Sequence, residues 1–210
     1  MSQFTPEELK EILIKHAKWL QKQDGGEQAI LKDADLSGAV LVGETLERAD
    51  LTGANLSSAN LTAANLSVAV LSGANLAGAN LSDAKLEGTF LDYADLSGAN
   101  LTKCTMVYTG LKGANLTGAI LRGMTAHNAN FTDAILKGAD LSRSRFNKSI
   151  LANTILDEAD LSGAAFYYVS FSGASLKGAD LTGAHFRDPV LTGADLGGAK
   201  LKGSNIKKRG

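Results

Sequence analysis

The residues best equipped for catalysis or metal binding are few: three histidines, His16, His127 and His185, and one cysteine, Cys104. Histidine serves as a general base or metal ligand, and a cysteine thiolate serves as a nucleophile. A single cysteine excludes an internal disulfide framework and a CxxC metal site. The glycine-rich stretch GADLGGAK, residues 193–200, lacks the lysine spacing and the following helix of a phosphate-binding loop. A catalytic or metal-binding site would therefore depend on secondary-structure elements that bring these few residues together.

Those elements repeat every five residues, as in ADLTGANLSSANLTAANLSVAVL, residues 49–71. Between Leu31 and Ile206, 28 of 36 positions spaced by five are Leu, and 24 of the 35 positions two residues before them, from 34 to 204, are Ala. A step of five turns about 140° round a helix, and in a straight strand it alternates between faces. The chain must therefore turn once per repeat, with Leu and Ala inside and the Ser-Gly pairs at the turns.

The departures from Leu indicate how many repeats close one coil. Six of the eight departures are spaced by 20 residues: Met106, Ala126, Phe146, Phe166, Phe186 and Ile206. A 15-residue coil would scatter them round the axis, whereas a 20-residue coil places them on one of four sides. The 176 residues of the repeat would then make 8.8 coils, in a rod about 40 Å long at the usual strand spacing.

The tandem A(D/N)LxG-like units at residues 31–206 resemble the pentapeptide repeat family over about five-sixths of the chain. This resemblance implies a right-handed quadrilateral β-helix. We therefore expect an all-β repeat solenoid with four pentapeptide repeats per 20-residue coil, about nine coils and an N-terminal capping α-helix. The expected divisions are a capping helix and connector at 1–30, the β-helix at 31–206 and a basic tail at 207–210.

Residues 1–30 lack the repeat and predict a helix. Thr5 is the expected N-cap, Pro6 suits the first turn and Glu8 completes a capping box. Gly25 and Gly26 mark the expected helix end. The apolar face comprises Leu9, Ile12, Leu13, His16 and Leu20. Such a helix would cover the open end of the solenoid, which repeat proteins need, or alternatively bind a partner.

Four positions depart from the repeat in ways that predict local structure. Glu44 occupies an inward position and is expected near the capping helix, satisfied by water, a helix lysine or His16. Met124 precedes Ala126, so a large residue beside a small one should keep the core volume constant. Pro189 removes a backbone donor and predicts a disrupted ladder. Cys104 should point inward as a small apolar residue.

One side of the predicted coil concentrates outward-facing aromatic and basic residues. Tyr and Arg are enriched at the energetic centres of protein interfaces, so this side is a candidate partner-binding surface; the alternative is irregular packing without a partner. His127 and His185 lie three coils apart, on the order of 14 Å, and cannot bind one metal. The candidate residues are Tyr108, His127, Arg145, Lys148, Tyr167, Tyr168, His185 and Arg187.

Charge divides unevenly along the chain. The formal charge is −1, with sums of −1, −5 and +5 over residues 1–30, 31–110 and 111–210. Either this is scattered solvated charge, or it favours head-to-tail contacts or an acidic partner at the basic end. A near-neutral chain without a dense basic stripe speaks against nucleic-acid binding. No segment is apolar enough for a membrane span, no secretory signal is evident, and we expect a cytoplasmic protein.

These patterns favour a non-enzymatic interaction or scaffold protein with an unidentified protein partner and no cofactor. A filled rod offers no concave pocket for catalysis. The family resemblance adds one alternative, an acidic DNA mimic that binds DNA gyrase as quinolone-resistance proteins do, although the basic second half departs from that group. A structural spacer is the second alternative. The short sequence after the last repeat also predicts a homodimer through an uncapped C-terminal end, or an edge protected by charge.

Overall fold

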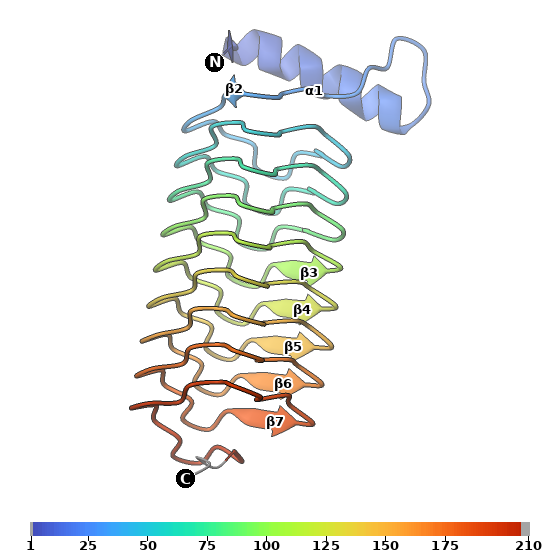
Figure 1. Cartoon of the computed structure of the whole chain (residues 1–210). Helices are drawn as coiled ribbons and strands as arrows, with labels where there is room; N and C mark the ends of the chain where they lie inside the picture. Colours follow the sequence, from blue (N-terminus) through green and yellow to red (C-terminus); the bar gives the residue numbers. More distant parts are fainter. Residues whose placement is uncertain (1, 207–210) are drawn as a thin grey trace.

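The computed structural model describes residues 2–206 and shows one parallel β-solenoid with one N-terminal helix (Figure 1). Residues 20 apart in the sequence pair in parallel, in four ladders that begin at Ile30, Asp35, Val40 and Thr45. This pairing confirms the 20-residue period. The basic segment predicted at 207–210 lies outside the described residues.

The longer strands lie in the second half of the chain. Five parallel strands form one sheet in the order β3-β4-β5-β6-β7, stacked along one side of the solenoid (Figure 1). Near the other end, β1 (Ser2–Gln3) pairs in parallel with β2 (Ala34–Asp35). The bounds of the five stacked strands are Thr105–Val107 for β3, Thr125–His127 for β4, Arg145–Asn147 for β5, Ala165–Tyr167 for β6 and His185–Arg187 for β7.

Most repeats are a short extended segment followed by a tight turn. In the first of them, the Ala34 N–H closes the turn by donating to the Leu31 oxygen at 3.2 Å, and the third turn residue, Asp33, has φ +53°. The next coil supplies the remaining bonds; the Leu51 N–H donates to the Val70 oxygen at 2.7 Å. Leu and Ala from most repeats fill the interior, as the sequence predicts. Since each coil buries its apolar side only against its neighbours, stability comes from stacking.

From β3 onward, a three-residue strand replaces the turn-rich repeat on one side. The left-handed residue follows the strand, as at Tyr108 with φ +54°. The amides of Thr109 and Val169, which correspond to Pro189, make no backbone hydrogen bond among the described residues. Pro189 therefore removes no backbone hydrogen bond that its equivalents from β3 onward form, and the Val190 N–H still donates to the Val169 oxygen at 2.9 Å. The predicted ladder disruption at Pro189 is wrong.

The helix α1 (Pro6–Leu20) begins as predicted. The Glu8 N–H donates to Thr5 Oγ1 at 3.2 Å, and the Thr5 N–H donates to a Glu8 carboxylate oxygen at 2.8 Å, which completes the capping box. The helix ends at Leu20, earlier than the glycines suggest. Gly26 instead lies against the helix, where a Cβ would come within 2.4 Å of the Trp19 nitrogen.

The irregular positions of the core have different outcomes. Met124 and Ala126 are both fully buried, and Ala126 pairs with Met106 on one side and Phe146 on the other. Glu44 is exposed, so its predicted inward position is wrong, but its predicted place near the capping helix is confirmed, because it lines a groove together with Leu9 and Leu13. The inward position of this residue depends on a preceding coil, and at this end β1 and α1 take the place of such a coil (Figure 1).

Candidate functional site

The predicted partner-binding residues lie on and beside β3–β7, and we call these eight residues the Tyr/Arg face. Side chains alternate along each strand, so the central residues, such as Phe146 and Phe166, point into the core and their neighbours point out. The outward positions of successive coils lie in parallel register, for example Tyr167 opposite Arg187. The sheet therefore arranges the residues of the Tyr/Arg face in columns along one side of the solenoid.

Tyr108 and His127 form the first cluster on the Tyr/Arg face. Tyr108 is 69% exposed, and its ring meets the His127 ring edge to face, with centroids 6.5 Å apart. Edge-to-face pairing is a favourable aromatic geometry. The pair joins two adjacent coils and leaves the tyrosine available to solvent.

The second cluster contains Tyr167, Tyr168, His185 and Arg187. The Tyr167 and His185 ring centroids are 6.0 Å apart. The Arg187 guanidinium carbon lies 5.6 Å from the Tyr168 ring centroid, within the range of a cation–π contact. Asp188 also lies near Arg187, with Nε and Oδ2 3.8 Å apart. These contacts restrain four aromatic or basic side chains in one area.

Arg145 and Lys148 lie on the intervening coil. Both are exposed, and neither forms an ion pair within residues 2–206. The Lys148 backbone N–H donates to the Tyr167 oxygen at 2.8 Å, so this residue adjoins the second cluster through the main chain. The structure therefore brings six of the eight residues into two clusters and leaves two cations without ion pairs between them.

An aromatic column supports the Tyr/Arg face from inside. Phe146 stacks on Phe166 with centroids 5.1 Å apart, and Phe166 stacks on Phe186 at 4.8 Å. Phe131 and Phe171 pack against this column from the adjoining side at 5.8 and 5.1 Å. Closely packed interiors have low compressibility, so this column provides a rigid base for the face.

Cys104 and His16 are buried rather than presented to solvent. Burial raises the pKa of the Cys104 thiol to about 12, which keeps it protonated and unreactive near neutral pH. His16 accepts a hydrogen bond at Nδ1 from the Ala29 N–H at 3.0 Å and stacks on Trp19. Burial lowers the pKa of His16, although the nearby Glu47 backbone and carboxylate oppose this shift. The side chains of Cys104 and His16 therefore pack in the interior of the protein.

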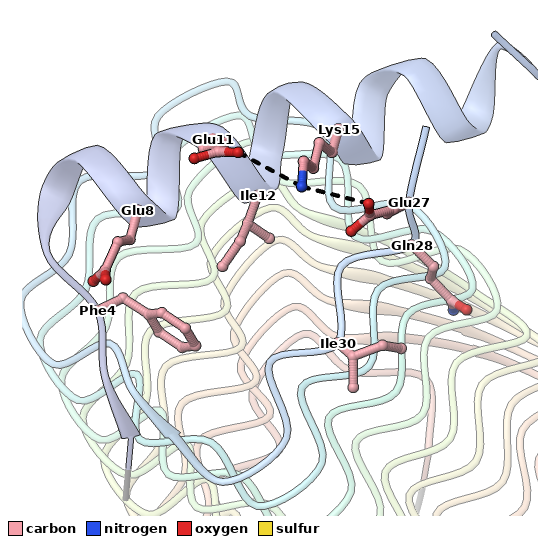
Figure 2. A pocket seen from close by; sticks show the side chains of 8 residues that line it. All are labelled: Phe4, Glu8, Glu11, Ile12, Lys15, Glu27, Gln28 and Ile30. Carbon is pink, nitrogen blue, oxygen red and sulfur yellow. Dashed lines mark ion pairs between the residues drawn. The ribbon is translucent and has the colours of Figure 1, made fainter. Parts of the chain in front are cut away.

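The repeat pattern does not predict a groove beside α1, which we call the acidic groove. Figure 2 shows Phe4, Ile12 and Ile30 beneath the helix, with Glu8, Glu11 and Glu27 around them; Lys15 and Gln28 complete the lining. Its volume is about 460 Å³. Lys15 Nζ lies 3.4 Å from a Glu27 oxygen and 3.5 Å from a Glu11 oxygen, and these carboxylates raise the lysine pKa.

A second groove, the apolar groove, also adjoins α1. Its lining includes Leu9, Leu13, Ile14, Val40 and Glu44, and its volume is about 740 Å³. Val40 is 77% exposed. Ile30 and Val40 hold the position before the central Leu, where Asn and Asp are common in other repeats. The same exchange occurs at Val70, Phe90 and Ile120, which line neither groove, so it does not predict a groove by itself.

Within residues 2–206 no group of three or more His, Cys, Asp or Glu side chains is placed to hold a metal ion. In the same part of the chain, no helix is long and apolar enough to cross a membrane.

A family model described as "Pentapeptide repeats" matches the chain in eight copies, over residues 29–67, 69–106, 109–147, 151–183 and 170–207. No curated protein gives a significant match. Among solved structures, the chain is similar to HetL, a pentapeptide repeat protein involved in heterocyst differentiation regulation from the cyanobacterium Nostoc sp. strain PCC 7120. That match has 29% identity, 97% coverage of each chain and a TM-score of 0.45.

Two further solved structures are similar over smaller parts of the chain. QnrB1, a plasmid-mediated fluoroquinolone resistance protein, has 20% identity, 86% coverage of this chain, 91% of its own and a TM-score of 0.36. A pentapeptide repeat protein from the Arabidopsis thaliana thylakoid lumen has 38% identity, 52% coverage of this chain, 66% of its own and a TM-score of 0.27.

Proposed function

Because the chain belongs to the pentapeptide repeat family, whose repeat accounts for its core and turns, we propose that its function lies where the repeat is irregular. In this proposal the protein is a non-enzymatic interaction module that binds a protein partner through the Tyr/Arg face. One observation carries the proposal: exposed tyrosines and cations are gathered on β3–β7, over a rigid aromatic column.

The chemistry of the face suits a protein partner. Tyrosine contributes a large contact area with few rotatable bonds, and arginine forms planar, directional hydrogen bonds. The contacts of Tyr108 with His127 and of Arg187 with Tyr168 restrain these side chains before binding. Prior restraint lowers the entropy cost of association. The free cations Arg145 and Lys148 favour an acidic contact region on the partner.

The non-enzymatic part of the proposal rests on the candidate catalytic groups. Cys104 is buried and protonated, and His16, a residue of α1, is fully buried. His127 and His185 each contact a tyrosine in separate clusters of the face. General acid–base or nucleophilic catalysis needs such groups within hydrogen-bonding distance of one another.

We further propose that the protein is located in the cytoplasm. The right-handed winding of the solenoid and its count of about nine coils also stay predictions.

The alternative of a DNA-mimicking gyrase binder requires a continuous acidic surface. The cations of the Tyr/Arg face are unsuited to that role, although the acidic sum of residues 31–110 keeps the first half as its candidate region. A supercoiling assay with DNA gyrase distinguishes the two functions: strong inhibition would favour mimicry. A passive spacer would neither inhibit gyrase nor retain a specific partner.

Affinity capture from the native cell tests the Tyr/Arg face. The variant Tyr108→Asn, Tyr167→Asn, Arg187→Asn removes its large contact groups, and Asn already occurs at equivalent positions in other coils, at Asn128 and Asn147. We expect this variant to lose the partner that the unmodified protein retains. The control Lys137→Asn, Lys177→Asn changes exposed residues on the side that begins at Leu36 and should retain it. Capture of the same partners by all three proteins would contradict the proposal.

A further inference from the structure

Both ends of the solenoid leave apolar side chains partly exposed. At the N-terminal end, α1 lies across the first coil, yet Ile14 is 50%, Ile30 57% and Val40 77% exposed. At the other end, Leu191, Leu196 and Leu201 are only half-buried, whereas the leucines of the preceding coil are fully buried. Exposed apolar groups gathered in one place indicate contact surfaces.

The two ends carry opposite charge. Residues 4–44 hold eight acids and five lysines, a sum of −3, and three of the acids surround the acidic groove (Figure 2). Residues 191–210 hold five cations and one acid, a sum of +4. A contact between two N-terminal ends or two C-terminal ends would bring like charges together, whereas a contact between unlike ends is attractive.

The backbone groups at the two ends of the solenoid are also complementary to one another. Within the solenoid, a Leu N–H donates to a carbonyl of the following coil, as from Leu176 to Asp195 at 2.7 Å. Among the described residues, the N–H groups of Leu196 and Leu201 make no such bond, and the carbonyls of Ile30 and Val40 accept none. Unpaired strand edges are templates for pairing with another chain. The C-terminal coil offers the donors that a following coil would satisfy, and the first coil offers the acceptors.

From charge, apolar exposure and edge polarity together we infer that this protein associates head to tail with a second copy of itself. The C-terminal coil of one molecule contacts the grooves that flank α1 of the next. The helix α1 and the strand β7 lie at opposite ends of the solenoid (Figure 1), so this contact cannot form within one molecule. A head-to-tail contact of this kind is heterologous and continues beyond two copies unless it closes into a ring. The inference does not depend on the partner proposed for the Tyr/Arg face.

Sedimentation and light scattering of the full chain test the inference. We expect the average mass to rise with concentration beyond that of a dimer at low salt, and to fall at about 1 M salt, where charges are screened within about 3 Å. A constant monomer mass at low salt would overturn the inference. A species that stops at two copies would also overturn it and favour a C-terminal homodimer.

Charge changes at each end identify the surfaces. The N-terminal variant Glu27→Lys, Glu44→Lys turns the sum of residues 4–44 from −3 to +1, and the C-terminal variant Lys202→Glu, Lys208→Glu turns the sum of residues 191–210 from +4 to 0; each should remain monomeric alone. Mixing the two should restore association, because the unchanged C-terminal end of the first variant then meets the unchanged N-terminal end of the second. The control Glu87→Lys, Glu158→Lys has the same net charge as the N-terminal variant, but its exposed changes lie between the ends, and it should associate like the unmodified protein. Association of either end variant alone to the unmodified extent, or no association in the mixture, would overturn the inference.

Discussion

Val68 shows a conflict between a residue and its position in the coil. It holds the third position of a turn with φ +59°. A left-handed backbone costs an L-residue roughly 1–2 kcal/mol, and branching at Cβ makes valine especially unsuited to it. The equivalent residue in the next coil is Gly88, with φ +64°. The turn geometry is therefore imposed by stacking rather than by the residue.

Replacing Val68 with Gly should stabilise the protein. Relief of the left-handed strain exceeds the added flexibility of the unfolded chain, and we expect a net gain of about 0.5 to 1 kcal/mol in the free energy of unfolding. Chemical denaturation measures this change. The reverse substitution Gly98→Val, at φ +63°, should lower the free energy of unfolding. A loss of stability in Val68→Gly would show that packing of the valine side chain dominates.

Cys104 should resist thiol reagents in the folded protein. Burial raises its pKa to about 12, so at pH 8 the thiol is protonated as well as inaccessible. A chromogenic disulfide reagent should label Cys104 rapidly in denaturant and more than a hundredfold more slowly without it. Rapid labelling of the folded protein would place this thiol at the surface, against its burial in the core.

At the scale of the element, His16 links α1 to the start of the solenoid. Its Nδ1 accepts the Ala29 N–H, so protonation at Nδ1 would replace an acceptor by a donor. Burial lowers the His16 pKa below its usual 6.5. The unfolded chain then binds the proton more readily than the folded one. The contribution of His16 to stability is therefore complete above pH 6.5 and declines as the pH falls toward the folded-state pKa.

The variant His16→Asn tests this coupling, because the amide oxygen can accept from Ala29 but does not titrate. The unmodified protein should lose more stability than His16→Asn when the pH falls from 7.5 to 5.5, as measured by denaturant unfolding. The carboxylates with lowered pKa, such as Asp140 and Asp180, titrate below 3.8 and leave this interval unaffected. Equal losses in the two proteins would exclude His16 as the titrating group.

The elements also show what sequence can and cannot predict here. The five-residue period predicted the solenoid, its core and the outward columns because every coil repeats the same geometry. The helix start was predictable because Thr5 and Glu8 interact locally. The exposure of Glu44 and the two grooves were missed because they depend on how α1 crosses the first coil, although the place of Glu44 near the helix was predicted. The stacking of Arg187 on Tyr168 also required the structure, since side-chain direction is not set by the period.

At the scale of the whole molecule, the solenoid is held together by contacts between successive coils. Parallel bridges join residues 20 apart over residues 30–200, from Ile30↔Asp50 to Asp180↔Lys200. Stability in such a protein is approximately a sum of repeat and interface terms, so a local change should spread only through neighbouring coils. The half-buried C-terminal coil, with one neighbour, should be the least protected part of the rod.

Hydrogen exchange can test this one-dimensional behaviour with Phe166→Ala. Phe166 contacts Phe146, Phe171 and Phe186, and a buried Phe→Ala change costs about 3–5 kcal/mol. We expect faster exchange of amides in residues 140–190, and little change in residues 45–90, which lie several coils away. The unmodified protein should already exchange fastest at residues 191–203. A uniform rise in exchange along the chain would instead show that the whole solenoid opens as one cooperative unit, in which case changes at the Tyr/Arg face would also alter the grooves beside α1.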